Sequence, residues 1–352
     1  MKFIPELREA CAVNAAALGA AFLSGREAAT FFAVTGRASW LGIAAAAVLF
    51  GALMGMLCHF SKSTGASTLP GIYYAKLDER CGDSISIVHG LLMLMTGAVA
   101  LTTAGELGML SLNCKHPTLT ASAVTMLVSM MLTLRSMRPL SAIGAVCLPI
   151  CAVFFIALAA DNRPVPVGAY IQNDLLDVSG NVPVALFMGL LYACLKAASV
   201  GGVAAARAKK LMPIRFGICC GGILAVVAGC ANLAMQKAGP EVWALNLPTV
   251  VLAARWGVFG YYTAIYVMWL GSVCVLSCAL GSVSALVSAQ LSRPAACIMT
   301  AAAVSLMSVT GLRPLVSTGY PMLGWICAIC LAALSLFYEG KKRRKTASLP
   351  IT

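Results

Sequence analysis

The stretch ALGAAFLSGREAATFF, residues 17–32, decides how this chain is interpreted. It is apolar almost throughout, yet its middle carries two adjacent charged residues, Arg26 and Glu27. At the centre of a membrane-spanning helix a charged side chain costs about 2.5–3.5 kcal/mol, so it normally faces a cavity or a partner. The stretch is therefore a candidate for a functional site inside a membrane protein.

The residues just before this charged pair predict an interruption of the helix. Ser24 and Glu27 have the spacing of a capping box, in which each side chain bonds the other residue's backbone amide where a helix begins. We therefore predict that one half-helix ends near Gly19 and that a second begins near Gly25. Unwound backbone at membrane depth is tolerated where it lines a cavity or is buried in protein. The alternative is a continuous helix in which Arg26 extends towards the membrane surface.

The composition of the whole chain places most of it in a lipid bilayer. The 352 residues are 60% hydrophobic and 11% charged, with a mean hydropathy of +0.90. Soluble domains carry about 25% charged residues, so this chain has too few charges to cover a water-facing surface. The net charge of +13 does not indicate nucleic acid, because in a membrane chain the distribution of Lys and Arg sets the topology. The composition excludes a soluble enzyme, a nucleic-acid-binding domain and a disordered protein.

Continuous apolar runs predict about ten transmembrane helices, because a helical crossing needs about 20 residues and a β-barrel would show short alternating strands instead. Residues 245–256 are predicted to form a short helix over the outer mouth. Most of the 25 Lys and Arg residues then lie on one side, which the positive-inside rule identifies as cytoplasmic. We expect a multi-pass protein of the cell membrane with both termini in the cytoplasm. The predicted spans are 11–34, 39–60, 84–112, 118–134, 139–160, 183–206, 214–236, 257–290, 295–311 and 318–338.

The sixth predicted span carries the second unusual group. Tyr192 and Lys196 are four residues apart and share a helix face. A lysine near the middle of a span is a functional-site candidate by default, and Gly201 and Gly202 predict a place where this helix loosens. Interrupted helices at matching positions of two halves are typical of inverted-repeat transporters with a site at the membrane midplane. The alternative role of Lys196 is an ion pair with Glu106 of the third span.

The sequence GAAFLSGRE, residues 19–27, with Phe31 and Phe32 after it, resembles the first-helix signature of the YkvI-like membrane proteins. The usual form of that signature is G-A-G-F-x-S-G-[QR]-E followed by a Phe pair. The family is similar to the amino acid–polyamine–organocation superfamily, which has a LeuT-like fold. The resemblance implies an all-α membrane protein of two five-helix inverted repeats, 1–160 and 183–338, with helices 1 and 6 broken, and a basic cytoplasmic tail, 339–352.

The same resemblance implies which residues bind a substrate and an ion. Sodium would lie between the first helix and Ser277 on the eighth helix. Relatives tend to have Thr-Thr-Ala where this chain has Ser277-Cys278-Ala279, and a thiol is a poor ligand for a hard cation. The substrate would contact the backbone of the first helix and side chains of the sixth, and the implied residues are Gly19, Ala20, Ala21, Phe22, Ser24, Gly25, Tyr192 and Lys196.

Two functions follow from these patterns. The first is a secondary active transporter that moves a small solute, an amino acid or a related zwitterion or carboxylate, by alternating access. Coupling would use H+ through Lys196, Glu27 or Glu106, or Na+ through Ser277. The second is a membrane sensor or receptor subunit that binds a solute on a transporter fold without moving it. The expected partners are the solute and the lipid bilayer, no nucleic acid and no cofactor are expected, and the oligomeric state stays open.

Neither the histidines nor the cysteines indicate catalysis. His59, His89 and His116 are far apart at or near span ends and form no known catalytic grouping, so an enzyme is not expected. Most of the 15 cysteines lie inside predicted spans, where a free thiol behaves as a small apolar residue. Cys327 and Cys330 share a span that holds no histidine or carboxylate, which favours packing over metal or redox chemistry.

Overall fold

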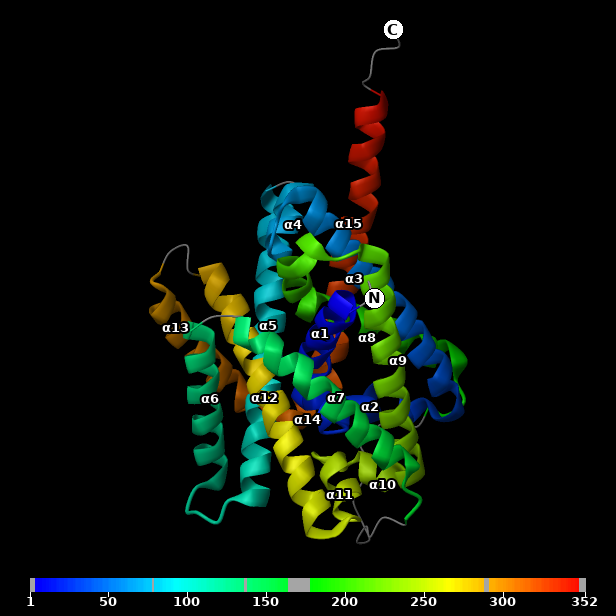
Figure 1. Cartoon of the computed structure of the whole chain (residues 1–352), viewed down its shortest axis with the longest axis vertical. Helices are drawn as coiled ribbons and strands as arrows, with labels where there is room; N and C mark the ends of the chain where they lie inside the picture. Colours follow the sequence, from blue (N-terminus) through cyan, green and yellow to red (C-terminus); the bar gives the residue numbers. More distant parts are fainter. Residues whose placement is uncertain (1–3, 78, 136–137, 164–177, 288–290, 348–352) are drawn as a thin grey trace.

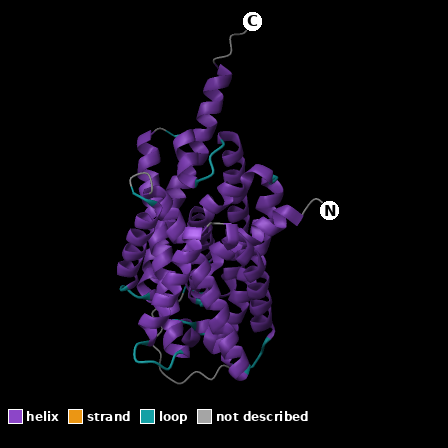
Figure 2. Cartoon of the chain, turned by 60° about the vertical axis from the view of Figure 1, so that its left-hand side comes forward, coloured by secondary structure: helices purple, strands orange, loops and turns teal. Residues whose placement is uncertain are grey.

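The computed structural model describes residues 4–77, 79–135, 138–163, 178–287 and 291–347, and in these ranges the chain is a helical bundle without a strand (Figure 1). Figure 2 shows the same helices from a second direction. The elements are α1 Ile4–Leu23, α2 Arg26–Phe31, η1 Ala33–Ala38, α3 Ser39–Thr64, α4 Leu69–Lys76, α5 Glu79–Ser111, α6 Pro117–Arg135, α7 Arg138–Ala160, α8 Val182–Arg207, η2 Ala208–Lys210, α9 Pro213–Ala238, α10 Pro240–Trp243, α11 Pro248–Ala254, α12 Gly257–Val287, α13 Arg293–Ser308, α14 Leu312–Pro314, η3 Leu315–Gly319 and α15 Tyr320–Ala347.

Seven helical segments within the described ranges are long and apolar enough to cross a membrane. Each of the ten predicted spans overlaps a described helix, but Ala145–Ala160 and Arg293–Ser308 are shorter apolar helices, and α1 carries charges in its first turns. The division into two five-helix repeats and the position of both termini therefore stay predictions. The seven segments are Ala33–Thr64, Glu79–Ser111, Pro117–Arg135, Val182–Arg207, Pro213–Ala238, Gly257–Val287 and Leu312–Leu336.

The first helical segment lies in the interior of the bundle, although it carries charged residues. α1 packs against α7, α9 and α12, and all six residues of α2 are buried (Figure 1). α15 extends beyond the other helices at the top of Figure 1. The side chains of the basic segment 341–345 and residues 348–352 lie outside the described part, so the membrane-anchoring role of this tail stays a prediction.

Glycines allow α3 to pack closely against two neighbouring helices. A Cβ at Gly189 of α8 would overlap the backbone carbonyl of Gly42 on α3, and Gly51 of α3 faces Gly217 of α9 in the same way. Small residues at helix contacts let backbones approach, which gains dispersion contacts where lipid removes the hydrophobic driving force. The membrane-buried part of the fold therefore depends on these glycines for close packing.

The predicted break of the sixth span is wrong. α8 runs as one helix from Val182 to Arg207, through Gly201 and Gly202. A Cβ at Gly201 would lie 3.1 Å from side-chain atoms of Leu57 and Leu69, so this glycine makes room for neighbouring helices. A glycine in a helix has two physical uses, flexibility and close approach, and here the second one applies.

Replacing Gly189 with alanine tests the packing of α8 on α3. The added methyl group overlaps backbone, which cannot rotate away, so we expect Gly189→Ala to lower the free energy of unfolding by about 1–3 kcal/mol. Thermal unfolding of the purified protein in detergent measures the change. The matched control is Gly222→Ala on α9, where a Cβ meets no atom within 4 Å and stability should be unchanged or slightly higher. Equal melting temperatures for the two variants would contradict this packing.

Candidate functional site

The first span is interrupted at two glycines, as predicted. Gly19 has non-helical dihedral angles (φ 9°, ψ −162°) inside α1, and Gly25 has a left-handed conformation (φ 88°) just before α2. A residue with a side chain would be strained at Gly25, and its Cβ would lie 2.6 Å from Met235 Cε. The two glycines thus divide the segment into a long helix, a short connecting turn and α2.

The predicted capping box does not form. The Ser24 hydroxyl accepts a hydrogen bond from the amide of Arg26 (3.2 Å), and the Ser24 amide donates to the carbonyl of Ala20 (2.9 Å). The Glu27 carboxylate bonds side chains of α8 instead of returning to Ser24. The physical reason is that a buried carboxylate gains more from a cation than from a neutral amide.

A buried ion pair joins α2 to α8. Lys196 Nζ lies 2.7 Å from Glu27 Oε1, and the Tyr192 hydroxyl donates to Glu27 Oε2 over 3.1 Å. The side chains of Glu27 and Lys196 are 1% and 5% exposed. Because Glu27 turns its two oxygens to two donors on one face of α8, its charge is satisfied without water. The prediction that Lys196 pairs with Glu106 is wrong, since Glu106 accepts a hydrogen bond from Asn246 (3.0 Å).

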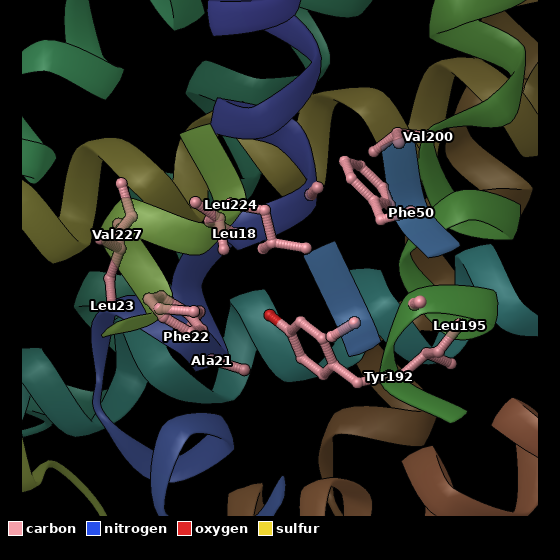
Figure 3. Close-up of a cluster of buried hydrophobic side chains, with 14 of the residues drawn as sticks. Leu18, Ala21, Phe22, Leu23, Phe50, Tyr192, Leu195, Val200, Leu224 and Val227 are labelled. Carbon is pink, nitrogen blue, oxygen red and sulfur yellow. The ribbon is translucent and has the colours of Figure 1, made fainter. Parts of the chain in front are cut away.

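Aromatic rings surround this pair. The rings of Phe31 and Phe32 lie 5.2 and 5.1 Å from the Tyr192 ring, and Phe22 lies 6.5 Å from it. Figure 3 shows Tyr192 pointing its hydroxyl from α8 towards α1, where Ala21 and Phe22 lie. Lys196 Nζ is 5.3 Å from the centroid of the Tyr192 ring, a distance at which the ring face attracts a cation. The rings place apolar surface around the pair, and this low-dielectric surrounding strengthens its attraction.

A small cavity lies next to the ion pair at the Gly19 break. It has room for about one water molecule. Four of the predicted substrate-binding residues line this cavity: Gly19, Ala20, Ala21 and Lys196. Phe22, Ser24 and Gly25 do not line it. Tyr192 does not line it either, but its hydroxyl donates to Glu27, which does. The complete lining is Ala16, Ala17, Gly19, Ala20, Ala21, Glu27, Thr96, Val99, Ala100, Lys196, Val275 and Tyr320.

The sequence analysis did not identify the two hydroxyl-bearing residues of this lining, Tyr320 and Thr96. Tyr320 begins α15, and Lys196 Nζ lies 5.4 Å from the centroid of its ring. An aromatic residue at the start of a span is normally a membrane-interface anchor, so nothing in the sequence distinguished it. Thr96 lies in the middle of α5, and its hydroxyl donates to the carbonyl of Leu92 (2.8 Å). A threonine bonded to its own helix gives no pattern that a sequence search can find.

The short helices α10 and α11 are attached to the interrupted segment. Arg26, which is fully buried, donates to the carbonyl of Trp243 at the end of α10 (2.7 Å). The amide of Thr249 in α11 donates to the carbonyl of Ser24 (3.0 Å). The short helix predicted over 245–256 is therefore present as α11, and a second short helix, α10, precedes it. Both satisfy backbone and side-chain groups that the break leaves without helical partners.

The predicted sodium ligand does not face the cavity. The Ser277 hydroxyl donates to the carbonyl of Val273 one turn earlier in α12 (2.7 Å), and Ser277 is absent from the cavity lining. Within the described residues, no three histidine, cysteine or carboxylate side chains are grouped to hold a metal ion. Sodium binding at Ser277 stays a prediction without geometric support from its side chain.

No protein-family model and no curated protein matches the chain, so the resemblance to the YkvI-like family stays a prediction. Similar solved structures are those of the manganese transporter of Eremococcus coleocola. A histidine-to-alanine mutant of that transporter is 14% identical, with a TM-score of 0.49, over 95% of this chain and 86% of the other. The complex of that transporter with an aromatic bis-isothiourea substituted compound is also 14% identical, with a TM-score of 0.49, over 99% and 89%.

A likeness of this size does not define the substrate or the residues of this chain. The class of protein rests instead on the chain itself. Seven long apolar helices and a charged pair sealed inside them define a multi-pass membrane protein with a polar centre.

Stability measurements test whether the two charges balance each other. Lys196→Met leaves the Glu27 carboxylate buried without a cation, which should lower the free energy of unfolding by about 3–5 kcal/mol. Adding Glu27→Gln should recover most of this loss, because no buried charge then remains. Arg8→Met removes the exposed partner of Glu9 and should change stability by about 0–1 kcal/mol. Additive losses in the Lys196 and Glu27 variants would show that the pair is not coupled.

Proposed function

We propose that the chain is a secondary active transporter that moves a small solute across the membrane by alternating access. The observation that carries this proposal is the Glu27–Lys196 ion pair, which lies at an interrupted helix inside an apolar bundle. A buried ion pair is a weak source of stability, because desolvation of two charges offsets their attraction. A pair that adds little stability at membrane depth is better explained by a role in binding charge.

The pair favours a zwitterionic solute, such as an amino acid or a related compound. The ammonium group of such a solute can take the place of Lys196 beside Glu27, and its carboxylate can take the place of Glu27 beside Lys196. One internal ion pair is then exchanged for two, and the net charge of the site stays zero. A solute with one uncompensated charge would leave a buried net charge, which costs far more in an apolar surrounding.

Movement is needed because the described site is closed. The cavity has room for about one water molecule, so a solute enters only after the surrounding helices separate. Gly19 and Gly25 are the backbone positions where the first segment can bend at low cost. Two such hinges on either side of the connecting turn suit a segment that opens to one membrane side at a time.

The same pair is the proposed route for proton coupling. When Lys196 leaves Glu27, each group faces an apolar surrounding that favours its neutral form, and a proton passes from lysine to carboxylate or to the solute. Glu106 is a weaker candidate because it bonds Asn246 in a separate contact. Sodium coupling through Ser277 is also weaker, since that hydroxyl is engaged within its own helix.

The alternative proposal is a sensor that binds the same class of solute without moving it. The closed cavity and the attachment of α10 and α11 to the interrupted segment favour this alternative, because a rigid cover would prevent release on the far side. Binding and flux must therefore be measured separately.

A ligand screen followed by a flux assay tests the proposed function. We expect at least one zwitterionic amino acid to raise the melting temperature of the detergent-purified chain, since a ligand that binds the folded state stabilises it. Proteoliposomes should then show counterflow of the radiolabelled solute. Lys196→Ala should abolish both signals, and Lys115→Ala, an exposed loop lysine, should preserve both.

The outcomes separate the two proposals. Stabilisation without counterflow would replace the transporter with the sensor. No stabilisation by any amino acid and no counterflow of any would contradict the zwitterion as substrate class. Full counterflow in the Lys196→Ala variant would remove the ion pair from the mechanism.

A further inference from the structure

Four cysteines on two helices form a thiol-rich contact that the proposed transport does not use. Cys147 and Cys151 are four residues apart on α7, and Cys274 and Cys278 are four residues apart on α12. Residues with this spacing lie on one helix face, so each helix presents a pair of thiols in one direction. All four cysteines are free.

The structure brings the two pairs together. Cys147 of α7 and Cys274 of α12 line the same small cavity between the two helices. Cys151 lines it as well, and this second cavity also has room for about one water molecule. Gly19 lines both this cavity and the one beside the ion pair. The cavity with the thiols and the cavity beside the ion pair therefore meet the first helix at the same residue, Gly19.

A small apolar role explains a single buried cysteine but not this contact. Alanine or valine fills such a volume equally well, whereas thiols from two helices at one cavity place soft sulfur donors next to each other. Sulfur donors select soft cations such as Cu+, and not the hard cations that prefer oxygen. Within the described residues no group of three potential ligands is ready to hold a metal, so a four-coordinate zinc site is not supported.

We propose that Cys147 and Cys274 bind one soft, thiophilic cation of the Cu+ type between α7 and α12. Binding to two thiols releases one proton: Cu+ replaces the hydrogen of one thiol, and the other sulfur donates a lone pair as a thiol. The complex is then neutral, which the apolar surrounding requires. No electron is transferred, so neither oxidant nor reductant takes part. Cys151 lies one helical turn away and supplies a third sulfur if the cation draws one in.

The bound cation would act on the hinge at Gly19. α7 and α12 both pack against α1. A cation that joins α7 to α12 would fix the positions of the two helices against which α1 bends. Metal binding to the thiols would therefore hold the interrupted segment in one position. The site itself is independent of the proposed transport, because it requires only the contact between the two helices.

Competition with a copper chelator tests the site on the full chain. Purified, reduced protein in detergent receives one equivalent of Cu+ in the presence of a colorimetric Cu+ chelator, and the retained copper is measured. We expect the wild-type chain to retain one ion and Cys147→Ser/Cys274→Ser to bind at least tenfold more weakly. The matched control is Cys230→Ser/Cys297→Ser, which removes two thiols from α9 and α13 and should retain the ion. Melting temperatures of all three proteins establish that each is folded.

A second measurement needs no variant. Alkylation of the wild-type chain with and without one equivalent of Cu+, read by peptide mass spectrometry, should show protection of Cys147 and Cys274 before other cysteines. X-ray absorption at the copper edge should show sulfur neighbours only. Equal copper retention by the Cys147→Ser/Cys274→Ser variant, or protection that falls first on other cysteines, would overturn the proposal.

Discussion

Glu27 and Lys196 face each other inside an apolar bundle, where neither charge is tolerable without the other. The surroundings are apolar, so each ionised group needs an opposite charge and hydrogen-bonding partners within the protein. The pair meets this condition with one ion-pair contact of 2.7 Å and one tyrosine hydroxyl. The left-handed turn at Gly25 starts α2 immediately before Glu27, so the position of the carboxylate depends on the interruption of the first helix. The rings of Phe31 and Phe32 pack on Tyr192 and add apolar surface near the pair, which strengthens the attraction further.

The interruption of the first helix has its own requirements. Each broken helix end exposes backbone groups that lipid cannot satisfy. Here α10 and α11 provide partners. The carbonyl of Trp243 accepts a hydrogen bond from the Arg26 side chain, and the amide of Thr249 donates to the carbonyl of Ser24. These short helices therefore stabilise the break. Under the proposed alternating access, a motion that bends the first segment would also change these contacts with α10 and α11.

Gly19 connects the two chemically distinct regions of the bundle. On one side lies the cavity with Glu27 and Lys196, and on the other lies the cavity lined by Cys147, Cys151 and Cys274. A charge-binding region and a sulfur-rich region thus share one backbone hinge. Because packed interiors shift between discrete arrangements instead of deforming smoothly, the ligands proposed for the two cavities would act on the same backbone position.

The sequence by itself determined the membrane setting and the break in the first helix, because both depend on local properties. An apolar run long enough to cross a bilayer is a property of one continuous segment. The same holds for the glycines before Arg26, which allow the break through their own backbone conformation. The tertiary structure alone decided the partners. Lys196 lies 169 residues from Glu27, and helix docking selected Glu27 over Glu106 and prevented the capping box with Ser24. Docking also decided that α8 stays continuous at Gly201, since neighbouring leucines occupy the space that this glycine leaves.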